Sequence, residues 1–211
     1  GNLGELAVAA IPDLIKMFYN QKNNINGPTS GPWAASDCYT DNGCYQAAVA
    51  LGKIGRFQEL EKIVVPALTK PMLEEEGLEI RKFAAISLQI LGQKAAPAVP
   101  FLIKALVNHD EQVRFYAIDA LGAIGQEAAP AIPDLINILA DQKRYDYERY
   151  PLLVFSLSTC AATTLGKIGT SALPALLQTL KSPDAYVRAK SVEAIDIMGA
   201  AAEKTIPDLI T

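Results

Sequence analysis

Apolar residues recur along the chain at the spacing of an amphipathic helix, and each run lies beside a proline. Within a run the apolar positions are i, i+3, i+4 and i+7, which places them on one face of a helix. Proline suits the first turn of a helix, because the N–H group that it lacks would have no acceptor there. The runs predict one kind of helix, named helix A, with these apolar faces: Ile11, Leu14, Ile15 and Phe18; Val99, Leu102, Ile103 and Leu106; Ile132, Leu135, Ile136 and Leu139; Leu173, Leu176, Leu177 and Leu180.

A second helix, named helix B, is predicted after each helix A and a polar turn. Small residues on its apolar face would let neighbouring helices approach closely, and a glycine after the face predicts the end of the helix. Two copies of the face are Ala117, Ala120, Leu121 and Ile124, and Ser191, Ala194, Ile195 and Met198.

Two series of residues keep these helices in register. The closing glycines are Gly4, Gly55, Gly92, Gly125, Gly169 and Gly199, and the prolines that follow are Pro12, Pro66, Pro100, Pro133, Pro174 and Pro207. One helix pair has too little surface to close a core, whereas stacked pairs share a continuous one. The sequence therefore predicts an all-α fold: a right-handed α-solenoid of about five helix A/helix B repeats, with long loops between helix A and helix B in the first and fourth repeats.

The repeats predict a single domain over residues 1–211. Their approximate ranges are 5–55, 56–92, 93–125, 126–169 and 170–199, with a partial repeat at 200–211. Residues 1–14 align with residues 122–135, so the chain opens at the end of a helix B, and it closes within a helix A. We therefore expect a segment of a longer solenoid or multidomain chain.

The stretch DEQVRFYAIDALGAIG, from Asp110 to Gly125, combines Asp-x-x-Val-Arg with an Ala-Leu-Gly-x-Ile-Gly ending. It resembles the HEAT-like repeat of phycobilisome-lyase-type proteins, and looser copies extend the resemblance over nearly the whole chain. The resemblance implies a stacked helical scaffold. It also implies, as an alternative, a bilin lyase subunit or a phycobilisome assembly or degradation factor, with a bilin or a phycobiliprotein as partner.

The Val-Arg arginine recurs at Arg81, Arg114 and Arg188, and Asp110 and Asp184 lie four residues before the last two. We interpret each such aspartate as a residue that favours the start of helix B and pairs with the arginine of its own repeat.

Two long insertions separate helix A from helix B. Residues 20–42 are rich in Asn, Gly, Pro and Ser and contain Trp33 and Tyr39, while residues 141–151 contain Tyr145, Tyr147 and Tyr150. Insertions in repeat proteins tend to lie on one face, and exposed aromatic side chains are frequent binding hot spots. These aromatic residues are candidates for protein binding, or alternatively for lids over adjacent helices.

Helix B is predicted to line the concave side of the solenoid. Two ladders of residues run along successive helix B elements. They lie two and five residues after the position that holds Arg81, Arg114 or Arg188 in three of the repeats. The first ladder is Gln46, Phe83, Tyr116, Cys160 and Lys190; the second is Val49, Ile86, Asp119, Thr163 and Glu193. Phe83, Ile86 and Tyr116 make the middle of this surface apolar. They are candidates for the floor of a protein-binding groove, or alternatively for burial against neighbouring helices.

Charge and cysteine content narrow the function classes. The net charge is −4 and the pI is near 5.1, which disfavours a broad nucleic-acid surface. The chain contains no run of 18 uninterrupted apolar residues, so a membrane span is not expected. Three cysteines do not suggest a disulfide framework, although Cys38 and Cys44 could pair. Because disulfide frameworks belong to oxidising compartments, we expect a cytoplasmic protein.

Nothing in the sequence predicts a catalytic, cofactor-binding or metal-ligating residue. The chain has one histidine, His109, and neither a zinc spacing nor a nucleotide-binding glycine motif. The favoured interpretation is therefore a non-catalytic scaffold that presents the concave helix B face and the aromatic loops to another protein. Nucleic-acid binding is the least favoured reading.

Overall fold

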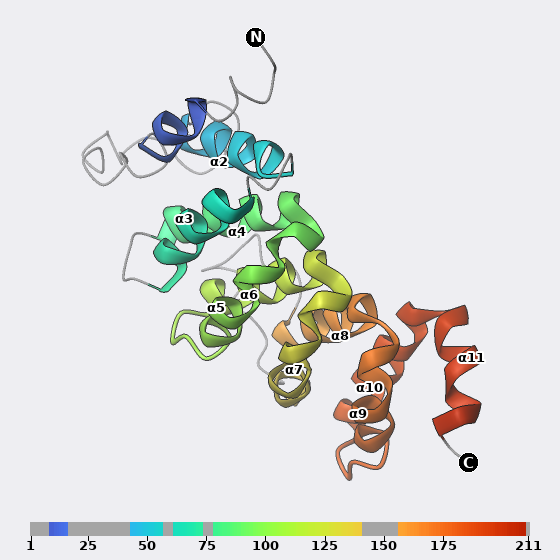
Figure 1. Cartoon of the computed structure of the whole chain (residues 1–211). Helices are drawn as coiled ribbons and strands as arrows, with labels where there is room; N and C mark the ends of the chain where they lie inside the picture. The colour runs from blue at the N-terminus through green and yellow to red at the C-terminus, as the bar shows by residue number, and fades with distance from the viewer. Residues whose placement is uncertain (1–8, 17–42, 57–60, 74–77, 141–155, 210–211) are drawn as a thin grey trace, which may run out of the picture.

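The chain forms a stack of helices that follow one another along an arc (Figure 1). The computed structural model describes residues 9–16, 43–56, 61–73, 78–140 and 156–209, and every regular element in these ranges is helical. The helix A elements are residues 9–16, α3 (Glu61–Leu73), α5 (Val99–Ala105), α7 (Ile132–Ile138), α9 (Leu173–Thr179) and α11 (Ala200–Leu209). The helix B elements are α2 (Gly43–Ile54), α4 (Leu78–Leu91), α6 (Glu111–Ile124), α8 (Leu157–Ile168) and α10 (Ala185–Met198). The predicted all-α repeat solenoid is confirmed.

Two layers run through the stack. Each helix B packs on the next, from α2 through α4, α6 and α8 to α10, and α3, α5, α7, α9 and α11 form the second layer. In Figure 1 the elements α3, α5 and α7 lie along the left and lower edge of the arc. Because each helix touches mainly its own partner and its neighbours in the stack, the core is continuous along the chain rather than central.

Between α4 and α5, between α6 and α7, and between α8 and α9, helix B passes into the next helix A through a glycine and a short 3-10 helix, whereas α11 begins directly after Gly199. At the end of α6, Gly125 has φ 73°, a left-handed conformation that favours glycine, and its N–H bonds to the carbonyl of Leu121. The 3-10 helix η4 (Gly125–Ala131) follows, and η3 (Gly92–Ala98) and η5 (Thr170–Ala172) occupy the same place elsewhere. Their buried alanines let these turns stack closely. The predicted glycine stop is confirmed at Gly55, Gly92, Gly125, Gly169 and Gly199, while Gly4 lies outside the described residues.

The prolines mark helix starts in three repeats. Pro100, Pro133 and Pro174 lie in the first turn of α5, α7 and α9. Pro207 instead lies well inside α11, which begins directly after Gly199, and Pro66 lies well inside α3, so the prediction of a first-turn proline is wrong at both positions. The residues before Pro66, Glu61 to Val65, contain no turn-forming pattern, and α3 therefore begins before the proline.

The tightest packing occurs between successive helix B elements. The residue seven before the closing glycine is fully buried in four repeats, at Ala48, Ala85, Ile118 and Ala162. Hydroxyl groups also join these helices: Ser87 donates to the carbonyl of Ala48 (2.7 Å). Thr164 in α8 likewise donates to the carbonyl of Ile118 in α6 (3.0 Å). Each of these buried hydroxyls is therefore satisfied by the backbone of the preceding repeat.

The predicted aspartate–arginine pair within a repeat is wrong for Asp110. Asp110 does cap α6, because its carboxylate accepts the N–H of Gln112 (2.9 Å). Its ion pair, however, is with Arg81 of the preceding repeat (3.5 Å). Arg114 donates to the carbonyl of Asn108 (2.8 Å) and pairs with Glu111. A carboxylate that caps the helix is turned toward the backbone N–H groups and away from a side chain one turn later.

Among the residues that the structure describes, one stretch, Phe83–Ala105, is long and apolar enough to cross a membrane by length and composition alone. In this structure it is divided between α4, η3 and α5, with a left-handed glycine, Gly92, between them. Leu88, Leu91 and Leu102 from the stretch belong to the buried core. Its apolar character is therefore accounted for by packing within the solenoid.

Candidate binding pocket on the helix B face

The helix B layer is the more closely packed of the two. A curved stack bends toward the layer whose elements stand closer together, so this packing supports the prediction that helix B lines the concave side. Glycines permit the close approach: a Cβ atom at Gly166 of α8 would lie 2.6 Å from the Cβ atom of Ile197 in α10.

A pocket of about 470 Å³ lies on this layer, between α6, α8 and α10. Its walls combine a ring, hydroxyls, a thiol and charges: Phe115, Asp119, Thr159, Cys160, Thr163, Thr164, Lys167 and Glu193. The volume falls in the range of about 300–1,000 Å³ that is usual for binding sites of small molecules and partner side chains.

Asp119 of α6 is the half-buried carboxylate of the pocket. Its Oδ2 atom accepts a hydrogen bond from the side-chain amide of Gln89 in α4 (2.5 Å). Burial raises the pKa of Asp119, and neither the charge of Lys167 nor the Gln89 hydrogen bond lowers it enough to offset this. The carboxylate is therefore held in a place that disfavours its charged form.

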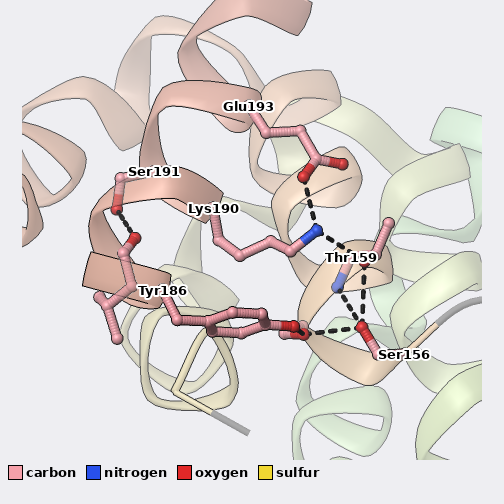
Figure 2. A network of polar contacts seen from close by, with 8 residues as sticks. Ser156, Thr159, Tyr186, Lys190, Ser191 and Glu193 are labelled. Atoms are coloured by element: carbon pink, nitrogen blue, oxygen red, sulfur yellow. Dashed lines mark hydrogen bonds and ion pairs between the residues drawn. The ribbon is translucent and has the colours of Figure 1, made fainter. Parts of the chain in front are cut away.

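Lys190 of α10 joins two walls of the pocket (Figure 2). Its ammonium group pairs with Glu193 (2.7 Å) and donates to the hydroxyl of Thr159 in α8 (2.8 Å). The Lys190 side chain is 16% exposed. The lysine thus balances the charge of Glu193 and fixes α10 against α8.

A second set of polar contacts lies beside this one. The hydroxyl of Tyr186 in α10 hydrogen-bonds with that of Ser158 in α8 (2.6 Å), and Ser158 with Ser156 (2.8 Å). Ser156 also caps α8 by accepting the N–H of Thr159 (3.3 Å). The Lys190 ammonium lies 5.8 Å from the centre of the Tyr186 ring. These contacts fix the position of α10 against α8 at this wall of the pocket.

Cys160 lines the pocket without being a reactive thiol. Burial, followed by the charge of Asp119, raises its pKa to about 11. With this raised pKa the Cys160 thiol is almost fully protonated at neutral pH. The thiolate is the nucleophilic form of cysteine, so the protonated thiol is a poor nucleophile. Its role in the pocket is that of a polarisable wall.

The apolar candidates from the sequence divide between core and surface. Phe83 is 3% exposed and belongs to the core, so its ring offers no accessible groove floor. Ile86 and Tyr116 are half-buried and pack against that core. The Tyr116 ring meets the ring of Phe115, a pocket residue, edge to face at 5.4 Å between centroids. The aromatic loop candidates Trp33, Tyr39, Tyr145, Tyr147 and Tyr150 lie outside the described residues.

The second ladder marks the pocket better than the first. Asp119, Thr163 and Glu193 all line it, whereas Cys160 is the one member of the first ladder that does so. Phe115, Thr159, Thr164 and Lys167 also line the pocket but belong to neither ladder. Phe115, Thr159 and Lys167 lie one helical turn from Asp119 or Thr163, so extension of the second ladder by a turn in each direction finds them, and Thr164 is adjacent to Thr163.

Replacement of Asp119 by asparagine is expected to raise the free energy of unfolding at neutral pH. Asparagine keeps an oxygen for Gln89 and removes the buried charge. A raised folded-state pKa means that the charged carboxylate destabilises the fold above that pKa, while below the unfolded value of 3.8 the carboxyl group is neutral in both states. The gain of the variant over wild type should therefore shrink as the pH falls toward 3.8. Urea titrations at several pH values measure this difference in the free energy of unfolding. A stabilisation by Asp119→Asn that grows at acid pH would contradict the raised pKa of Asp119.

Together these features define an all-α helical repeat solenoid with a pocket on its helix B face. Residues 65–150 match the family model for HEAT repeats. A search of curated protein sequences finds no match.

The solved structures similar to the chain include two that align with most of it. The first is an engineered protein, with a TM-score of 0.50 and 22% identity over 95% of this chain and 85% of that one. The second is the complex of CpcE and CpcF of phycocyanin lyase from Nostoc sp. PCC7120, with a TM-score of 0.52 and 21% identity over 89% of this chain and 98% of that one. At these identities the likeness shows the shared fold alone.

Proposed function

We propose that this solenoid is a non-catalytic scaffold that binds another protein on its helix B face, with the pocket between α6, α8 and α10 at the centre of the contact. HEAT repeats generally mediate protein binding, and they account for residues 65–150. The observation that carries the proposal is the pocket itself, about 470 Å³ on the layer predicted to be concave.

Pre-organisation supports this assignment. Lys190 and Tyr186 tie α10 to α8 through the hydroxyls of Thr159 and Ser158, and Gln89 holds Asp119 from α4. A site whose side chains are already ordered loses less conformational entropy when a partner binds. The aromatic residues of the two loops remain predicted secondary contacts, and the cytoplasmic setting remains a prediction.

A blocking substitution tests the proposal. Thr163→Arg introduces a long cationic side chain into the pocket and should weaken capture of a partner at least about ten-fold, a loss of about 1.4 kcal/mol. Val107→Arg is the matched control, because Val107 is 79% exposed in the turn after α5 and lies outside the pocket. Affinity capture from source-cell lysate identifies partners by mass spectrometry.

The variant that fails to capture the partner shows whether the helix B face or the aromatic loops bind it. A protein retained by wild type and by Val107→Arg, but lost by Thr163→Arg, would place the contact on the helix B face. Loss with a Trp33→Ala/Tyr147→Ala double variant and not with Thr163→Arg would move the contact to the loops. Equal recovery with all variants would contradict both sites.

The resemblance of the Asp110–Gly125 motif to phycobilisome-lyase repeats favours a second candidate, a bilin lyase-type subunit or a phycobilisome assembly or degradation factor. Captured material that absorbs visible light would favour this candidate. A partner whose affinity falls steeply with salt would instead favour nucleic-acid binding.

A further inference from the structure

We propose that the pocket receives a cationic side chain, a lysine or an arginine, from the protein bound on the helix B face, with Asp119 as the counter-charge. This inference rests on the proposed function and specifies the chemistry of the contact. The charged groups of the pocket differ in whether a described residue of opposite charge contacts them.

The first step is the pair at the α10 wall. Glu193 is bound to Lys190 at 2.7 Å, and the same ammonium is held by Thr159. These opposite charges are in direct contact and close to neutral together. Glu193 therefore contributes a fixed and polar wall more than a free negative charge.

The second step is Asp119. Within the described part of the chain, its hydrogen-bond partner is the neutral amide of Gln89, and it forms no ion pair. A half-buried carboxylate in this position lacks a cation at hydrogen-bond distance, while it faces a cavity with room for one. An entering guanidinium or ammonium group would supply that partner, and charge-assisted hydrogen bonds of this kind are about twice as strong as neutral ones.

Lys167 is the lysine that lines the pocket. Its side chain runs past Gly122, is exposed to solvent and makes no ion pair among the residues described. Solvent and salt screen an exposed ammonium much more than they screen a half-buried carboxylate. At the Cys160 sulfur, Asp119 has a larger effect on the thiol pKa than Lys167 has. Lys167 thus leaves Asp119 without a cation in direct contact among the described residues.

The remaining walls of the pocket also suit a long cationic side chain. The Phe115 ring can lie against the methylene stem of a long cationic side chain or face its guanidinium, and Thr163 offers a hydroxyl acceptor. An aromatic surface, hydroxyl acceptors and one desolvated carboxylate are features that suit arginine or lysine. They suit an anionic side chain poorly, because it would meet Asp119.

The test uses N-acetyl-arginine-methylamide and its citrulline counterpart, which has nearly the same shape and no charge. Each is titrated into ¹⁵N-labelled protein, and the backbone amide shifts of Asp119 and Thr163 are followed. We expect arginine to bind at least ten-fold more tightly than citrulline, and the carboxyl pKa of Asp119, read by ¹³C NMR, to fall when arginine is bound.

Two variants control the experiment. Asp119→Asn should remove the preference for arginine, whereas Asp196→Asn should preserve it, because Asp196 is an exposed carboxylate of α10 outside the pocket. Equal shifts with arginine and citrulline, no shift with arginine up to its solubility, or an unchanged preference in Asp119→Asn would each overturn the inference. If a protein partner still depended on Thr163, the proposed function would stand while the cationic occupant would be rejected.

Discussion

Replacement of Ile118 by aspartate is expected to destabilise the solenoid by more than about 4 kcal/mol, because it buries a charge without a partner. Ile118 is 0% exposed, and it lies on α6 where α8 packs. Repeat proteins depend on interfaces between neighbours, so the loss should reach α6 and α8 first. Urea denaturation followed by circular dichroism measures the free energy, and amide hydrogen exchange locates the loss.

Val192→Asp is the matched control. Val192 of α10 has the same register position, seven before the closing glycine, but it is 56% exposed because no described helix covers it. The same chemical change there should alter the free energy of unfolding by no more than about 0.5 kcal/mol. Similar losses at both positions would contradict the stacking order of the helix B layer.

Replacement of Gly52 by alanine is expected to destabilise the protein by about 1–3 kcal/mol through overpacking. A Cβ atom at Gly52 would lie 2.8 Å from the carbonyl oxygen of Ser87 and 2.8 Å from the Cβ atom of Ile90. Neither atom can move without a shift of α4, and the buried hydrogen bond from Ser87 to Ala48 joins the same two helices. Thermal and urea denaturation measure the change.

Gly55→Ala provides the comparison within the same repeat. Its Cβ atom would approach the Cδ2 atom of Leu91 most closely, at 2.6 Å, and that atom ends a flexible side chain. Rotation of Leu91 relieves most of the contact, so the loss should be smaller than at Gly52. A larger loss at Gly55 would show that the spacing between α2 and α4 is not set by the backbone approach at Gly52.

The helix pairs were predictable because they follow from local chemistry. Pro133 at the start of α7 and Gly125 at the end of α6 act through the backbone of their own turns, and the sequence shows both directly. It was also predictable that the residues of the second ladder share one face of the stack, since helical spacing fixes which residues lie on the same face. Asp119, Thr163 and Glu193 reach the same pocket for this reason.

Contacts between repeats were less predictable. The hydrogen bond from Gln89 to Asp119 and the ion pair of Arg81 with Asp110 each join two repeats, and their formation depends on the offset and angle between stacked helices. Helical periodicity fixes a face of one helix but not this offset. The same limit explains Phe83, whose ladder position suggested an accessible floor and whose ring is buried by its neighbours.

The most direct test of the central claim is the dissociation constant of a captured partner for the Thr163→Arg variant, measured beside wild type and Val107→Arg by calorimetric titration. Binding on the helix B face predicts at least a ten-fold weaker affinity for Thr163→Arg, with unchanged affinity for Val107→Arg and unchanged thermal stability of both variants. Wild-type affinity in Thr163→Arg would contradict the claim that the pocket between α6, α8 and α10 is the centre of the binding surface.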